Sequence, residues 1–86
     1  MKQFTYTIQD ALGFHARPAG MFAKLAKSFA DTTITLSANG KTINPGQLMK
    51  LMGMGIKQGC EVTLTCEGAN EEHAAAELKD FLEKNL

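Results

Sequence analysis

Residues 13–20 of this chain combine side chains that together could bind and receive a phosphoryl group. His15 is followed two residues on by Arg17 and then by Pro18, a residue that suits the first turn of a helix. A histidine at a helix entrance faces unpaired backbone N–H groups, here those of Ala16 and Arg17, and the positive end of the helix dipole. That environment favours an anion and disfavours imidazolium, so we expect a neutral, nucleophilic ring. The Arg17 guanidinium adds a cation whose fork geometry suits phosphate oxygens.

The alternative is that His15 has no chemical role. A lone histidine near a helix start is more often a surface or capping residue than a catalyst. His73, which follows two glutamates, is of that ordinary kind and is assigned no role. His15 differs because each of its neighbours has a separate use at an anion site. The residues alone leave both interpretations open.

The run Gly-Phe-His-Ala-Arg-Pro-Ala at residues 13–19 resembles the active-site signature of HPr, the histidine-containing phosphocarrier family of the bacterial sugar phosphotransferase system. The likeness covers essentially the whole chain, with further similar residues at 39–41, 48–49, 54–56, 59 and 67–68. The resemblance implies that phosphate passes from phosphoenolpyruvate through enzyme I to His15. It implies onward transfer from His15 to sugar-specific IIA domains.

Length and composition limit the other possibilities. The 86 residues suffice for one domain, expected to span residues 1–86, with a modest core of aliphatic side chains, alanine and methionine. Nine basic residues balance nine acidic ones, so net charge gives no argument for a nucleic acid or membrane partner. No segment is long enough to span a bilayer, and the N-terminus lacks the apolar stretch of a signal peptide. We therefore expect a cytoplasmic monomer.

Neither the cysteines nor the histidines are expected to bind a metal. Cys60 and Cys66 fall in one predicted strand, whose rise would separate them by roughly 20 Å. That separation is too long for a disulfide or a shared metal ion, so we expect two reduced thiols that act as small apolar residues. His15 and His73 have no clustered ligands near them in sequence. No metal and no cofactor is predicted.

Hydrophobic periodicity indicates alternating strands and helices. Alternation of apolar and polar residues, or an apolar run between turn signals, predicts strands at residues 4–8, 33–36, 41–43 and 60–66. Apolar stripes at helical spacing predict helices at residues 18–29, at about 47–52 and after Asn70, which is a good N-cap. Asn39-Gly40 is a two-residue hairpin signal, and residues 9–13 form the loop that leads to His15.

The order of these elements is βαββαβα, and each strand has one apolar and one polar face. One-sided strands suit a sheet with helices on one face and water on the other. We predict an α+β fold, a two-layer open-faced β-sandwich with a four-stranded, mostly antiparallel sheet and three helices on one face. The resemblance to HPr implies the same fold.

Two surfaces near His15 are candidates for partner binding. At about 100° per residue, one flank of the first helix carries Ala16, Gly20, Lys24 and Lys27, which would suit docking of an acidic partner. The alternative is an ordinary solvated helix face, and the resemblance to HPr favours docking.

The short second helix is rich in leucine and methionine, and a helix packed on a sheet buries only one stripe. Exposed methionines adapt to several partners, whereas the alternative places all of these side chains in the core. The resemblance implies that Leu51 is buried. It implies that Leu48, Met49 and Met52 meet enzyme I and the IIA domains.

Two residues depart from the HPr pattern. Leu12 stands where many relatives have serine or asparagine, so a polar contact near the imidazole is expected to be missing. Gln47 stands where many Gram-positive relatives carry a regulatory serine.

Two other functions stay open. One is a regulatory paralogue that uses the same phosphohistidine in a nitrogen-type relay or with a transcription factor. The other is a binding module without phosphorylation, against which the spacing of His15 and Arg17 argues.

Overall fold

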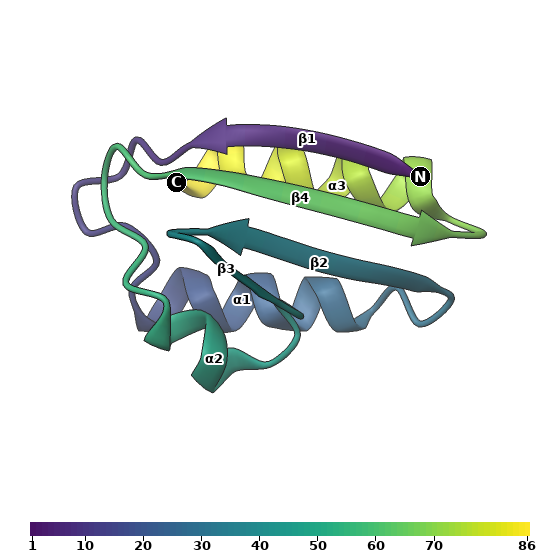
Figure 1. The fold of residues 1–86 in the computed structure, drawn as a ribbon, viewed down its shortest axis with the longest axis horizontal. Helices are drawn as coiled ribbons and strands as arrows, with labels where there is room; N and C mark the ends of the chain where they lie inside the picture. The colour runs from purple at the N-terminus through teal and green to yellow at the C-terminus, as the bar shows by residue number, and fades with distance from the viewer.

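The computed structural model describes all of residues 1–86 and arranges them as a four-stranded sheet with helices packed on one side (Figure 1). The elements follow in the order β1 (Lys2–Thr7), α1 (Ala16–Lys27), β2 (Thr32–Ala38), β3 (Lys41–Ile43), α2 (Leu48–Gly53), β4 (Glu61–Gly68) and α3 (Glu71–Asn85). The predicted order βαββαβα is therefore confirmed. The predicted helix at 18–29 is displaced, because α1 begins at Ala16 and ends at Lys27.

The sheet has the strand order β1-β4-β2-β3, and every neighbouring pair is antiparallel. Leu64 of the central strand β4 faces Phe4 on one side and Leu36 on the other. The predicted hairpin at Asn39-Gly40 is also confirmed, since both residues have positive φ, 52° and 76°. Positive φ at both central residues gives a turn whose twist matches that of the flanking strands.

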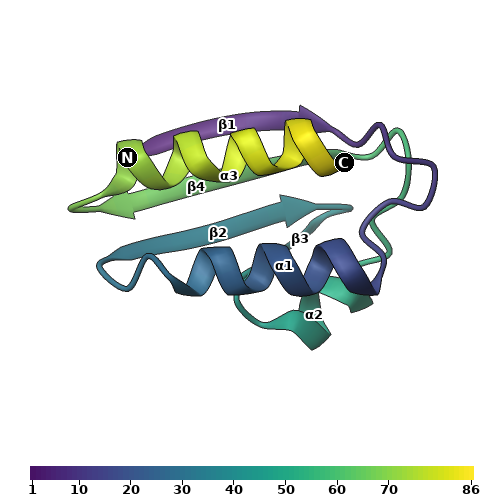
Figure 2. The ribbon, with the colours of Figure 1, turned by 180° about the vertical axis from the view of Figure 1, so that it is seen from behind.

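Helices α1 and α3 lie side by side across one face of the sheet, as Figure 2 shows from the helical side. No helix or strand covers the other face (Figure 1), as the open-faced prediction requires. The short helix α2 packs against α1 and buries Leu51 completely. None of the three helices combines the length and the apolar run needed to cross a bilayer.

The core lies between the sheet and the two long helices. Alternate residues of β2 and β4 are buried, which places the apolar side of each strand toward the helices. The ring of Phe22 on α1 is fully buried, 5.3 Å from the ring of Phe14 and 5.5 Å from that of Phe81 on α3. These aromatic pairs join the loop before α1 to both long helices.

Both cysteines are free thiols. Cys66 is fully buried, and burial, followed by the nearby carboxylate of Glu71, raises the pKa of its thiol. A thiol held in its protonated form is a poor nucleophile and metal ligand. This environment agrees with the predicted role of Cys66 as a small apolar residue.

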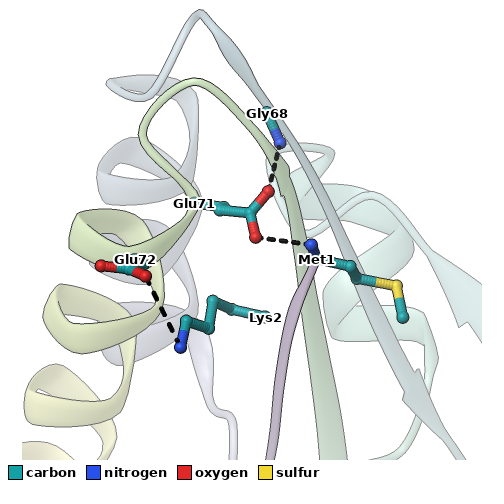
Figure 3. A network of polar contacts seen from close by, with 5 residues as sticks. All are labelled: Met1, Lys2, Gly68, Glu71 and Glu72. Atoms are coloured by element: carbon teal, nitrogen blue, oxygen red, sulfur yellow. Dashed lines mark hydrogen bonds and ion pairs between the residues drawn. The ribbon is translucent and has the colours of Figure 1, made fainter.

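The start of α3 is held by Glu71 rather than by the predicted cap. Asn70 is the N-cap residue, but its side chain makes no capping hydrogen bond. The Glu71 carboxylate instead accepts a hydrogen bond from the Gly68 N–H and pairs with the Met1 ammonium, while the neighbouring Glu72 pairs with Lys2 (Figure 3). The Met1 ammonium, and then the Gly68 N–H, lower the pKa of Glu71 below its usual value. Glu71 therefore ties the beginning of β1 to the beginning of α3.

We predict that Glu71→Gln lowers the thermal unfolding temperature at neutral pH. A carboxylate whose pKa is lowered by folding stabilises the protein above its unfolded pKa, and this contribution is lost as the pH falls through the folded value. The difference between the variant and the unchanged protein should therefore shrink on acidification, as followed by circular dichroism. Glu72→Gln is the matched control and should have a smaller effect, because Glu72 and Lys2 are exposed and 3.7 Å apart. A Glu71→Gln difference that stays constant into strong acid would contradict this assignment.

Candidate functional site

His15 is the N-cap residue of α1, with extended backbone angles of φ −83° and ψ 177°. Its neighbour Phe14 is buried, whereas the His15 side chain is 42% exposed. The extended backbone sends consecutive side chains in opposite directions, so burial of Phe14 turns the imidazole outward. Pro18 is the third helical residue, which places it in the first turn as the sequence predicts.

The first turn of α1 leaves two backbone N–H groups unpaired. The N–H groups of Ala16 and Arg17 have no hydrogen-bond partner, and Pro18 has no N–H to offer. The first intrahelical bond is made by Ala19, whose N–H donates to the His15 carbonyl at 3.0 Å. Two free donors at the positive end of a twelve-residue helix form a local environment that favours an anion beside His15.

The loop that carries His15 is tightly hydrogen bonded. Every backbone N–H from residue 8 to residue 15 donates a hydrogen bond, except that of Ala11. Gly13 has φ +64°, and a Cβ at this position would lie 2.4 Å from the Ile56 carbonyl oxygen. The Phe14 N–H donates to that same oxygen at 3.1 Å. Only glycine permits both the positive φ and the close approach to the backbone of Ile56. Gly13 therefore fixes how the loop that carries His15 packs before α1.

Arg17 lies in the same shallow surface pocket as His15. The pocket is lined by His15, Arg17, Pro18, Met21 and Asn85. The two residues predicted to do chemistry are thus brought together. Met21 and Asn85 are additions that sequence reasoning missed. Met21 follows Arg17 by one helical turn and could have been found from that spacing, whereas Asn85 reaches the pocket from the end of α3 through the tertiary fold.

A second charged group beside the imidazole was also missed. The Asp10 carboxylate oxygen Oδ2 lies 3.8 Å from His15 Nε2, and its side chain is 37% exposed. The side chain of Leu12, which replaces the serine or asparagine of many relatives, is exposed. Asp10 therefore supplies a polar neighbour from two residues further back in the loop. No local pattern indicates this contact, because it depends on the conformation of the loop.

The predicted partner-binding residues are on the surface. On α1, Lys24 and Lys27 are exposed and Gly20 is partly buried, while the stem of Lys27 lies against Gly46. On α2, Leu51 is fully buried, as expected, and Leu48, Met49 and Met52 are exposed. Met49 is the most exposed large apolar side chain of the protein, at 82%. The alternative in which all α2 side chains belong to the core is therefore wrong.

The second histidine lies far from this arrangement in the fold. The His73 ring packs edge-on against Phe29, at a centroid distance of 5.7 Å, and its Nε2 is 3.8 Å from the Glu77 carboxylate. No three His, Cys, Asp or Glu side chains are grouped so that they could hold a metal ion. His15 therefore differs from His73 in sharing a surface pocket with an arginine.

Comparison with known sequences gives full-length similarity. The family model described as "PTS HPr component phosphorylation site" matches residues 2–84. The phosphocarrier protein HPr of Mycoplasma genitalium is 38% identical over 85 residues, which cover 99% of this chain and 97% of that relative. HPr of Mycoplasma pneumoniae is 36% identical over the same shares of the two chains.

Solved structures give the same result. A histidine-containing phosphocarrier protein, solved in work on the divergence of mycoplasma from Gram-positive bacteria, matches with a TM-score of 0.91 and 36% identity over 96% of this chain and 93% of its own. HPr from Thermoanaerobacter tengcongensis matches with a TM-score of 0.91 and 37% identity over 98% of this chain and 93% of its own. The catabolite repression protein Crh of Bacillus subtilis matches less closely, with a TM-score of 0.75 and 30% identity over 100% of this chain and 98% of its own. The chain belongs to the HPr family of phosphocarrier proteins of the phosphotransferase system.

Proposed function

We propose that this protein accepts a phosphoryl group on His15 from phosphorylated enzyme I and passes it to IIA domains of sugar permeases. The observation that carries this proposal is the start of α1, where the imidazole stands beside two unpaired N–H groups and shares a pocket with Arg17. Membership of the HPr family supports the same role. The protein is proposed to act in the cytoplasm as a monomer, and an HPr dimer from Thermoanaerobacter tengcongensis is known among its solved relatives.

The residues at this site have distinct parts in the proposed transfer. A ring nitrogen of His15, Nδ1 by the family pattern, attacks phosphorus as the bond to the donor breaks. The N–H groups of Ala16 and Arg17 and the guanidinium of Arg17 bind the phosphoryl oxygens. Because the imidazole is exposed, the phosphorylated ring can be presented to the next protein without a conformational opening.

The exposed residues of α1 and α2 are the proposed docking surface. Leu48, Met49 and Met52 provide an apolar patch whose unbranched methionines can adapt to differently shaped partners. Lys24 and Lys27 add positive charge on the flank of α1. Such an arrangement suits partners that combine an apolar contact with acidic residues.

A regulatory relay that uses the same phosphohistidine is the second candidate. The likeness to Crh, a protein named for catabolite repression, supports it. The two candidates differ in the protein that receives the phosphoryl group, a sugar-specific IIA domain or a regulatory protein. The closer structural match to HPr favours the carrier role.

We predict that phosphoenolpyruvate and a bacterial enzyme I add one phosphoryl group to the chain, as measured by intact-mass spectrometry. The group should be labile in acid and stable in base, as a ring-nitrogen phosphoramidate is. His15→Ala should abolish the mass gain. Arg17→Ala should slow it by about ten- to hundredfold, the range expected for loss of one charge-assisted hydrogen bond. His73→Ala is the control of the same residue type and should behave as the unchanged protein. A modified mass that persists in His15→Ala would refute the assignment.

Met49→Glu should weaken the binding of enzyme I, because it places an unpaired charge in the interface. The expected cost is about 2–5 kcal/mol if the side chain is fully buried in the complex, measurable by titration calorimetry. Met49→Leu keeps the apolar contact and should bind nearly as well as the unchanged protein. Unfolding caused by Met49→Glu would contradict the hypothesis, since Met49 would then belong to the core.

Lys24→Glu and Lys27→Glu should test the charged part of the same surface. Both should lower the association rate with enzyme I, and the effect should fade in high salt. Lys79→Glu on α3 changes the charge equally and should leave the association rate unchanged. An equal loss in all three variants would show that net charge, rather than the docking surface, governs association.

Because Gln47 replaces the regulatory serine of many Gram-positive relatives, we predict that this protein is not regulated by phosphorylation at the start of α2. It is the exposed N-cap residue of that helix and has no hydroxyl group to receive phosphate. Incubation with an HPr serine kinase and ATP should therefore leave the mass unchanged, and Gln47→Ser is the matched gain-of-function variant. Stoichiometric phosphorylation of Thr42 or another nearby hydroxyl would show that this regulation has moved to a new position.

A further inference from the structure

Asp10 lies beside the nitrogen of His15 that the proposed transfer does not use. Its Oδ2 atom is 3.8 Å from Nε2, an ion-pair distance. A neutral imidazole carries one proton, and a nearby carboxylate favours that proton on the nitrogen that faces it. The lone pair is then left on Nδ1. A carboxylate in this position thus favours the tautomer whose lone pair is on Nδ1.

The loop holds Asp10 firmly in this position. Its carbonyl accepts a hydrogen bond from the Gly13 N–H at 3.0 Å, and its own N–H donates to the main-chain oxygen of Leu86 at 2.7 Å. The carboxylate oxygen Oδ2 also accepts a hydrogen bond from the Leu12 N–H at 3.2 Å. The same oxygen therefore faces both the Leu12 N–H and the imidazole, so the carboxylate cannot turn away from His15 without breaking a bond of the loop.

We infer that Asp10 is a positioning residue for phosphoryl transfer: its carboxylate keeps a proton on His15 Nε2 and presents Nδ1 to the incoming phosphoryl group. The inference rests on the proposed function of His15. It assigns Asp10 a role after transfer as well, because the phosphorylated ring that retains its Nε2 proton is a cation, and the carboxylate stabilises it.

The transfer step balances without a separate proton acceptor. The Nδ1 lone pair forms the N–P bond, the bond between phosphorus and the donor breaks, and its electron pair leaves with the donor. The Nε2 proton stays on His15. In onward transfer the acceptor attacks phosphorus and the N–P electron pair returns to Nδ1. A ring that is protonated on Nε2 leaves as neutral imidazole, which is a good leaving group. By stabilising that proton, Asp10 keeps the phosphoryl group transferable at higher pH.

The other groups around His15 do not provide this effect. Asp10 is the only carboxylate within 4.0 Å of an imidazole nitrogen of His15. Arg17 in the same pocket and Lys57 in the segment packed behind Gly13 are cations, and neither side chain offers an acceptor for the Nε2 proton. Met21 and Asn85 complete the pocket and are neutral. Asp10 is therefore the side chain placed to stabilise a proton on Nε2.

Asp10→Asn separates the charge of this residue from its part in the loop. The amide oxygen can still accept the Leu12 N–H, while the negative charge is removed. Each protein is phosphorylated with phosphoenolpyruvate and enzyme I, and loss of the phosphoryl group is followed by phosphorus NMR over a range of pH. In Asp10→Asn the acid-catalysed loss should begin at lower pH, and both loss and transfer to a IIA domain at neutral pH should slow about two- to fivefold, the size of an exposed ion-pair effect. Asp31→Asn, which removes the same charge in the loop between α1 and β2, should leave the profile unchanged.

The outcomes separate the two proposals. If the unchanged protein takes up no phosphoryl group, the proposed function fails. If it is phosphorylated and the Asp10→Asn profile coincides with its own, only the role of Asp10 is overturned. A second measurement does not depend on a variant: nitrogen NMR of the neutral His15 ring should show the proton on Nε2, and a proton on Nδ1 would overturn the inference.

Discussion

The burial of Phe14 against Phe22 determines where His15 points. Full burial of a phenylalanine contributes about 1.5–3 kcal/mol, and an edge-to-face ring pair adds about 0.5–1.5 kcal/mol. An exposed ion pair such as Asp10 with His15 contributes about 0.2–1 kcal/mol. The apolar contact is therefore strong enough to fix the loop, and the polar contacts of the site then act on a ring whose direction is already set. Gly13 makes this burial possible, because only glycine allows the backbone to approach Ile56 so closely.

The same arrangement would allow a small protein to bind a phosphoryl group without enclosing it. The unpaired N–H groups of Ala16 and Arg17 are fixed by the helix, so they need no reorganisation when charge arrives. The site is shallow, and its imidazole is half exposed. A carrier has to give its phosphoryl group away, and a shallow site with a few well-placed donors favours reversible binding over tight retention.

Local sequence signals predicted most of the fold. The Asn39-Gly40 turn and the alternation in β2 and β4 depend on residues close together in the chain, and both appear as expected. The start of α1 was placed too late, because Pro18 is tolerated throughout the first turn and does not mark a unique position. Asn70 is the N-cap residue of α3, as the sequence predicts, but its side chain makes no capping hydrogen bond. The contacts of Glu71 with Met1 and with the end of β4 depend on the tertiary fold and have no local signal.

The residues of the candidate site also separate into those with a local sequence signal and those that depend on the tertiary fold. His15 and Arg17 were evident from the motif, and the exposure of Met49 followed from the limited face that a short helix can bury. Asp10 and Asn85 were not predictable, because one depends on the turn at Gly13 and the other on how α3 ends beside α1.

The central claim is that the phosphoryl group on His15 is held by the N–H groups at the start of α1. Amide NMR of the protein before and after phosphorylation tests this most directly. The largest downfield shifts should belong to the Ala16 and Arg17 N–H groups, with little change at the start of α3. Unchanged Ala16 and Arg17 signals in a fully phosphorylated protein would contradict it.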